Sequence, residues 1–174
     1  MTPKITKLGW SAYTLAALVI AVDQAVKYWV VEVLHLQDTP TVPVLGPLHL
    51  TFVWNPGVSF GFLRADQAVA RWGLVAFSLI VAALIVWWAR RSHRILQALG
   101  YGLITGGAVG NAIDRARFGA VVDFIDVQRL GFFPWVFNVA DSAITVGVIL
   151  LLADSLRREQ PASGGESHSP SSSA

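Results

Sequence analysis

The chain of 174 residues contains no cysteine and only four histidines, and both shortages limit its chemistry. Without cysteine it can form no disulfide, no thiolate-ligated zinc or iron–sulfur centre and no thiol nucleophile. The histidines are scattered along the sequence, so a histidine-based metal site is not expected. Any acid–base chemistry is left to carboxylates, hydroxyls, amides and a few basic side chains. We therefore expect neither a metal nor a cofactor.

Charge is also scarce, at 14% of residues, and the net charge is only +2. The basic residues form neither a long run nor a single face, which argues against a nucleic-acid partner. Hydrophobic residues, by contrast, make up 54% of the chain, and the mean hydropathy is +0.55. A soluble domain of this length could not bury so much apolar surface. The sequence therefore predicts an integral membrane protein.

Four apolar segments have roughly the 20 residues that a membrane-spanning helix needs. They cover about residues 9–31, 70–89, 95–113 and 137–154 of a single membrane domain, residues 1–158. The first segment follows Lys4 and Lys7 and could instead belong to a cleaved signal peptide, but no A-x-A cleavage site follows it. The connecting segments 32–69 and 114–136 are expected outside the bilayer, and the Ser/Gly/Pro-rich residues 159–174 are expected to be disordered.

A dense group of arginines sets the expected orientation in the membrane. Arg90, Arg91 and Arg94 lie in the very short loop between the second and third segments. Short loops rich in arginine and lysine remain in the cytoplasm. With four spans, both chain ends fall on the same side as this loop. We therefore expect both termini in the cytoplasm and the longer connecting segments on the opposite, extracytoplasmic face.

Two acids, Asp123 and Asp141, flank one short excursion from the membrane. Asp123 lies in an alternating segment, residues 120–127, on the face that carries apolar residues, where a raised carboxyl pKa is expected. Asp141 begins the fourth apolar segment within a polar stripe that is expected to face the bundle interior. The stripe contains Asn138, Asp141, Ser142 and Thr145. Two carboxylates that share a site can divide the roles of acid and base and activate a water for peptide hydrolysis.

The first apolar segment carries a second pair of charges, Asp23 and Lys27. Their i, i+4 spacing puts them on one face, where they can form an ion pair inside the bundle. They could equally mark the outer end of the helix, with both side chains reaching the interface. If the pair is internal, a structural clamp and a direct role beside the acids are about equally favoured.

Other polar positions and glycines have more than one interpretation. Asn55 precedes Pro56 and Gly57 after a predicted strand, and alone it is better explained as a turn residue. In the third segment glycines recur every four residues and predict close packing with a neighbouring helix; they are Gly102, Gly106 and Gly110. Asn111, Asp114 and Arg115 follow on one face at the outer end of that segment.

Four sequence blocks together resemble signal peptidase II, the lipoprotein signal peptidase family. The blocks are DQAVK from Asp23, NPGVSFGF from Asn55, GGAVGNAIDR with GAVVDF from Gly106, and FNVADSAIT from Phe137. The resemblance implies an intramembrane aspartyl protease of the bacterial inner membrane, with four transmembrane helices, a small extracytoplasmic β-cradle and a covering loop or short helix. Its implied partners are membrane lipid and diacylglyceryl-modified prolipoproteins, which it cuts before the lipidated cysteine. We expect it to act as a monomer.

The resemblance also assigns roles to individual positions. Asp123 and Asp141 match the catalytic pair. Nine further positions match residues that support the pair or line the substrate site: Asp23, Lys27, Asn55, Gly57, Gly107, Asn111, Arg115, Asn138 and Ala140.

Two other classes of protein remain open from the residues alone. A small transporter would use intramembrane acids such as Asp23 and Asp141 as proton or cation sites. A bundle with purely structural polar contacts would also tolerate isolated polar residues. A transporter would not need an acid on an extracytoplasmic strand, and two acids that converge at one depth fit a purely structural bundle poorly.

Overall fold

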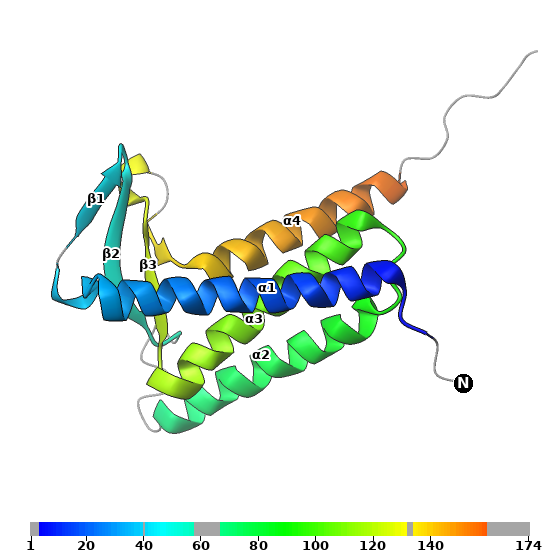
Figure 1. Ribbon diagram of the computed structural model, residues 1–174, viewed down its shortest axis with the longest axis horizontal. Coiled ribbons are helices and arrows are strands. Elements are labelled where there is room, and N and C mark those ends of the chain that lie inside the picture. Colours follow the sequence, from blue (N-terminus) through cyan, green and yellow to red (C-terminus); the bar gives the residue numbers. More distant parts are fainter. Residues whose placement is uncertain (1–3, 40, 58–66, 132–133, 160–174) are drawn as a thin grey trace, which may run out of the picture.

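The computed structural model of the protein describes residues 4–39, 41–57, 67–131 and 134–159. Over these ranges the chain forms four long helices and one small antiparallel sheet (Figure 1). The helices are α1 (Lys7–Tyr28), α2 (Gln67–Ala89), α3 (Ile95–Phe118) and α4 (Val139–Glu159). The strands are β1 (Val42–Leu45), β2 (Leu48–Asn55), β3 (Val121–Asp126) and β4 (Val136–Phe137). Short helical turns are η1 (Trp29–Val33), η2 (Leu36–Asp38) and η3 (Gln128–Leu130).

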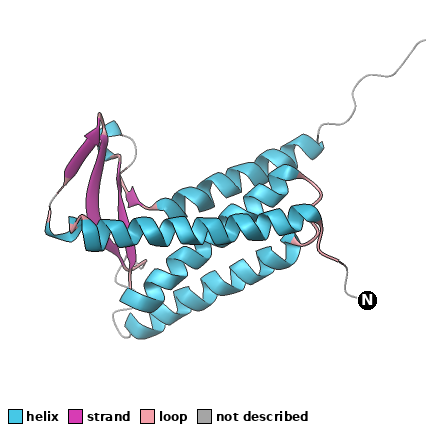
Figure 2. Ribbon diagram, in the orientation of Figure 1, coloured by secondary structure: helices cyan, strands magenta, loops and turns pink. Residues whose placement is uncertain are grey.

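The sheet lies at one end of the helical bundle, which we call the sheet end (Figure 2). The start of α1, the loop between α2 and α3, and the end of α4 all lie at the other end, which we call the loop end (Figure 1). An even number of bundle-crossing helices produces this arrangement. The polar segments between α1 and α2 and between α3 and α4 are thus brought together at the sheet end.

Three segments of the described chain are long and apolar enough to cross a membrane: Lys7–Val33, Ala68–Ala89 and Val139–Arg157. These match three of the four expected spans. Helix α3 is equally long, but its glycines and polar residues lower its hydropathy. It contacts α1, α2 and α4, so much of its surface faces protein. Its role as a fourth span stays a prediction.

Helix α3 packs closely against its neighbours through glycines. A Cβ at Gly102 would lie 2.8 Å from the Ala12 carbonyl oxygen of α1, and one at Gly106 would lie 2.6 Å from the Cβ of Val19. On the side of α4, a Cβ at Gly107 would collide with the carbonyl oxygen of Ala140. The expected close approach of a neighbouring helix is confirmed, and it occurs on two sides of α3.

The sheet has the order β1-β2-β3-β4, and every neighbouring pair is antiparallel. Val53 of β2 pairs with Asp123 of β3. Beneath the sheet, Val122 and Phe124 pack with Val30 and Leu36 in a small apolar core. Strand β3 therefore has buried side chains on both faces, and this anchoring fixes the position of Asp123 relative to the helices.

Two element boundaries differ from the sequence expectation. Helix α3 continues to Phe118, beyond the expected end at residue 113, and stops where Gly119 adopts a left-handed conformation, with φ 83°. Helix α4 begins at Val139, because Phe137 still belongs to β4. The expected disorder of residues 159–174 falls almost wholly on positions outside the described residues, as does most of the NPGVSFGF block.

Candidate active site

The first turn of α4 is closed by a reciprocal pair of hydrogen bonds between Asn138 and Asp141. The Asp141 amide donates to the Asn138 Oδ1 atom (2.9 Å), and the Asn138 amide donates to the Asp141 Oδ2 atom (3.2 Å). This is the geometry of a capping box, in which residues three apart satisfy the free amides of a helix start. The carboxylate of Asp141 is consequently held in one orientation at the sheet end.

The carboxylate of Asp123 accepts two amide hydrogen bonds. The Asn138 Nδ2 atom donates to its Oδ1 atom (2.7 Å), and the Asn55 Nδ2 atom donates to its Oδ2 atom (2.8 Å). Asp123 is only 1% exposed. Burial is the main cause that raises the pKa of Asp123 to about 6; the amide of Asn55 opposes the shift, and the nearby charge of Asp141 contributes to it. The expected raised pKa is therefore confirmed.

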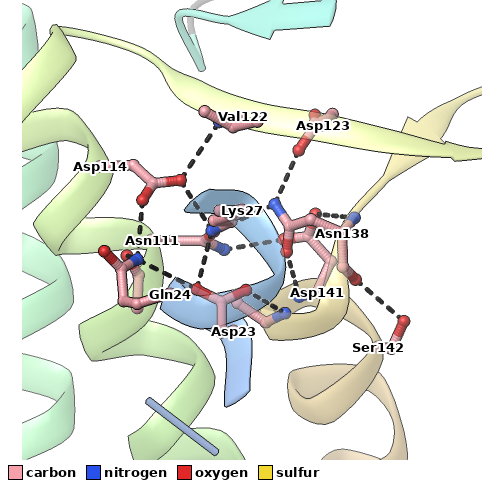
Figure 3. A network of polar contacts seen from close by, with 12 residues as sticks. Asp23, Gln24, Lys27, Asn111, Asp114, Val122, Asp123, Asn138, Asp141 and Ser142 are labelled. Atoms are coloured by element: carbon pink, nitrogen blue, oxygen red, sulfur yellow. Dashed lines mark hydrogen bonds and ion pairs between the residues drawn. The ribbon is translucent and has the colours of Figure 1, made fainter. Parts of the chain in front are cut away.

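Asn138 contacts both acids, and Asn111 completes the connection. Figure 3 shows Asp123 and Asp141 on either side of Asn138. The Asn111 Nδ2 atom donates to Asp141 Oδ1 (2.8 Å), and its Oδ1 atom accepts from Asn138 Nδ2 (3.2 Å). Two amide side chains thus fix the two carboxylates relative to one another, although the acids come from different elements, β3 and α4.

Behind the acids lies a buried ion cluster, which we define as Asp23, Lys27 and Asp114. The Lys27 Nζ atom lies 2.9 Å from Asp23 Oδ2 and 2.7 Å from Asp114 Oδ2 (Figure 3). It also donates to Asn111 Oδ1 (3.3 Å). All three charged side chains are at most 4% exposed. The interpretation that Asp23 and Lys27 reach the interface is therefore wrong: both are paired inside the bundle.

The ion cluster also holds backbone groups from both acid-bearing elements. The Ala140 amide, in the first turn of α4, donates to Asp23 Oδ1 (2.9 Å). The Val122 amide, next to Asp123 in β3, donates to Asp114 Oδ2 (3.2 Å). Gln24 adds a further bond to Asp114 Oδ1 (2.8 Å). These contacts favour the clamp interpretation, because the cluster positions β3 and α4 without touching either acid.

Arg115 lies beside the acid pair and adds positive charge to it. It interacts electrostatically with Asp141 and Asp123, and its buried Nε atom has no hydrogen-bond partner within the described part of the chain. Gly57 lies over the guanidinium with φ 78°, and a Cβ there would approach Arg115 Nη2 to 2.9 Å. Asn55 serves as a turn residue too, since its Oδ1 atom accepts from the Gly57 amide (2.8 Å).

The structure brings the expected site residues together at the sheet end, with one correction to the polar stripe. Thr145 does not face the bundle interior: it is exposed, and its hydroxyl donates to the carbonyl oxygen of Asp141 within the same helix. Two residues outside the expected set, Gln24 and Asp114, are part of the surrounding network. Asp114 had a usable signal, because it lies one turn after Asn111 on the same face of α3.

Taken together, the fold and the site are those of a helical membrane protein whose polar side chains converge on two carboxylates at one end of the bundle. A family model described as signal peptidase (SPase) II matches residues 15–157. The chain belongs to this family.

Curated relatives agree with this assignment. The chain is 51% identical to the lipoprotein signal peptidase of Caulobacter vibrioides, over 90% of this chain and 92% of that protein. It is 40% identical to the lipoprotein signal peptidase of Beijerinckia indica, over 97% and 100% of the two chains. Two solved structures, both titled as a bacterial membrane enzyme, share the fold with a TM-score of 0.73 each. Their identities are 28% and 29%, and the matches cover 98% and 90% of this chain and 100% and 99% of those chains.

Proposed function

We propose that this chain is a lipoprotein signal peptidase of the bacterial inner membrane. It removes the signal peptide from diacylglyceryl-modified prolipoproteins by cleaving the peptide bond before the lipidated cysteine. The family membership and the near full-length match to relatives of that name support this activity. We further propose that α3 is the fourth transmembrane helix, that both termini are cytoplasmic, and that the site faces the extracytoplasmic side.

In the proposed reaction, Asp123 and Asp141 act together on a water and the scissile carbonyl. Protonated Asp123 donates a hydrogen bond to the carbonyl oxygen, while the Asp141 carboxylate takes a proton from the water. As the water oxygen bonds to the carbonyl carbon, Asp123 transfers its proton to the carbonyl oxygen and a tetrahedral diol forms. Asp141 then passes its proton to the amide nitrogen and the C–N bond breaks. One diol hydroxyl returns its proton to Asp123, and the products are a carboxylic acid and an amine.

The observation that carries this proposal is that one residue, Asn138, binds both acids. A shared positioning residue supports a pair that works as a unit on one small molecule between them. The raised pKa of Asp123 supports its role as the partner that holds the proton, because burial disfavours its ionised form.

The surrounding residues have supporting roles in this proposal. Asn55 and Asn111 each donate to one carboxylate oxygen, and Asn138 donates to the other oxygen of each acid, so the orientation of both carboxylates is fixed for the reaction. Arg115 offsets negative charge that develops between the acids. The transporter alternative has less support, because Asp23 is fully buried and bound to Lys27 and to the Ala140 amide.

The proposal is tested by cleavage of a diacylglyceryl-modified prolipoprotein by purified protein in detergent, with a metal chelator present. Wild type should cut, whereas Asp123→Asn and Asp141→Asn should fold normally and cut at least about 100-fold more slowly. Asp126→Asn is the matched control, because Asp126 lies on the same strand and contacts Thr51 and the Gln128 amide, away from both acids. This control should retain activity.

Two results would contradict the proposal. Inert wild type would remove the assigned activity, and near-normal cleavage by either Asn variant would remove the acid pair. Cleavage of the same precursor without its diacylglyceryl group tests the preference for lipidated substrate separately from catalysis by the two acids. Equal rates on both precursors would leave the acid pair in place and refute the preference for lipidated substrate.

A further inference from the structure

A second polar site lies at the loop end of the bundle, opposite the two acids. A pocket of about 670 Å³ opens there, between the end of α2 and the start of α3. Ligand pockets in proteins commonly have volumes of 300–1,000 Å³. Its lining includes Trp87, Trp88, Arg91, Ser92 and Arg94. None of them has a role in the proposed proteolysis.

Ser92 is the feature of this pocket that packing does not explain. It is one of the lining residues of the pocket, it is only 2% exposed, and its Oγ atom has no hydrogen-bond partner within the described ranges. The Ser92 backbone is fixed, because its amide donates to the Ala89 carbonyl oxygen (3.0 Å). A buried hydroxyl without a partner is destabilising by roughly 1–3 kcal/mol. A ligand with hydrogen-bond acceptors would satisfy it.

The start of α3 supplies further donors at the same place. Arg94 is the N-cap residue of this 24-residue helix, and its side chain makes no capping hydrogen bond. The first amides of an α-helix have no partner inside the helix, and the helix dipole is positive at this end. A phosphate group at a helix start accepts from such amides. Helix α3 therefore presents an uncapped, electropositive end beside the Ser92 hydroxyl.

The charged side chains around the pocket favour an anion. Arg91 and Arg94 both line it, and the lining contains no acid. Asp154 lies nearby, but Arg94 (3.5 Å) and Gln97 (3.0 Å) already bind its carboxylate. Among the described residues Arg91 has no carboxylate partner of this kind, and its guanidinium lies 5.8 Å from the ring centre of Trp87. At least one full positive charge is thus available to a ligand.

The flanking tryptophans indicate the source of that anion. Trp87 and Trp88 are about half exposed and lie in the last turn of α2, a helix long and apolar enough to cross a membrane. Tryptophans gather where hydrocarbon meets headgroups, and basic pockets between spanning helices bind anionic headgroups. We propose that this pocket binds the phosphate of an anionic phospholipid, with Ser92, Arg91, Arg94 and the first amides of α3 as its donors.

Orientation of the protein alone would explain the arginines, because basic loops stay on the cytoplasmic side. It would not explain a buried hydroxyl without a partner beside an uncapped helix start. The two explanations therefore differ in what Ser92 does. If only bulk charge attracts the lipid, Ser92 does not contribute to binding, whereas in a phosphate site its hydroxyl donates a hydrogen bond to the ligand.

Native mass spectrometry of the full-length protein in detergent tests the proposal. The probes are dioleoylphosphatidylglycerol and dioleoylphosphatidylcholine, supplied together in equal amounts. Wild type should retain the phosphatidylglycerol preferentially, and Arg91→Gln should weaken this binding about fivefold. Ser92→Ala should weaken it by a similar factor, since one hydrogen bond is lost. Arg157→Gln is the charge-matched control, because Arg157 is exposed near the end of α4 at the loop end. It should bind like wild type.

Several outcomes would overturn the proposal. Equal losses in Arg91→Gln and Arg157→Gln with no effect of Ser92→Ala would show that only bulk charge attracts the lipid. Retention of both lipids to the same extent would exclude an anion site. Complete displacement of the lipid by excess inorganic phosphate would show that the site takes the free ion.

Proteolysis by all three variants at the wild-type rate would confirm that each is folded.

Discussion

Replacing Lys27 with methionine is expected to destabilise the protein by about 3–5 kcal/mol, the usual loss when one partner of a buried ion pair is removed. Lys27 lies within 2.9 Å of two carboxylates, from Asp23 and Asp114, and none of the three side chains has significant contact with solvent. Methionine has a similar length and fills the space. The loss therefore measures the two buried negative charges that would be left facing each other.

For a protein of this size, that free energy corresponds to a fall of roughly 6–20 °C in the unfolding midpoint. Tryptophan fluorescence during heating in mild detergent can follow it. Lys7→Met is the matched control, since Lys7 is exposed at the start of the same helix. It should change stability by less than about 0.5 kcal/mol.

A triple variant separates charge from packing. Asp23→Asn, Lys27→Met and Asp114→Asn together remove every charge of the ion cluster, yet leave side-chain oxygens that can accept from the Ala140 and Val122 amides. Most of the lost stability should return, because uncharged replacements of buried ion pairs are often neutral. The reasoning would be refuted if Lys27→Met cost less than about 1 kcal/mol, or if the triple variant were no more stable than Lys27→Met.

Three further outcomes are expected. Gly107→Ala should destabilise by about 1–3 kcal/mol in the same heating assay, because its Cβ meets α4, while Gly73→Ala, with open space around it, should be neutral or stabilising. The kcat/KM for a lipidated precursor should fall as pH rises through about 6, where Asp123 of the free enzyme loses its proton. The corresponding fall in kcat should occur at a higher pH than the fall in kcat/KM, because bound substrate excludes water and so disfavours the ionised form of Asp123. Asn138→Ser should stay folded, since serine still caps α4, but should cut about 100-fold more slowly because no amide joins the acids.

Each of these expectations has a clear opposite. Equal stability of Gly107→Ala and Gly73→Ala would mean that α3 and α4 are not in close contact. A kcat/KM that rises through pH 6 would make Asp123 the base and reverse the proposed roles. Full activity of Asn138→Ser would show that the acids are positioned independently of that amide.

Periodicity and composition were sufficient to predict the helices and the strand of the site, but not the hydrogen bonds and ion pairs that connect them. The apolar lengths of α1, α2 and α4 and the glycine spacing of α3 are local signals, and they predicted the helices and their close packing. The alternation in residues 120–127 likewise predicted β3 and the apolar surroundings of Asp123. Such signals depend only on neighbouring residues in the sequence, so a single amino-acid sequence is enough to detect them.

The roles of Asp114 and Asn138 depended on three-dimensional contacts that no local pattern contains. Asp114 was placed on a face with Asn111, but its partner Lys27 is 87 positions earlier in the chain. Helical spacing predicted Asn138 as part of a polar stripe, and the family resemblance implied a supporting role, but neither predicted that it caps α4 and reaches across to β3. Thr145 shows the converse error: helical spacing put it on the interior stripe, but a local bond to Asp141 allows it to face outward.

The spacing of Asp23 and Lys27 has a consequence for how the chain enters the membrane. The two residues are one turn apart on α1, so the helix can neutralise its own charges before any later segment has been synthesised. Asp114 has its ion-pair partner on a different helix, since within the described residues it pairs with Lys27 of α1 and not with a residue of α3. Burial of that third charge therefore requires that the first and third helices are correctly paired. Because Asp23 also binds the start of α4, the position of the last helix depends on the same contact.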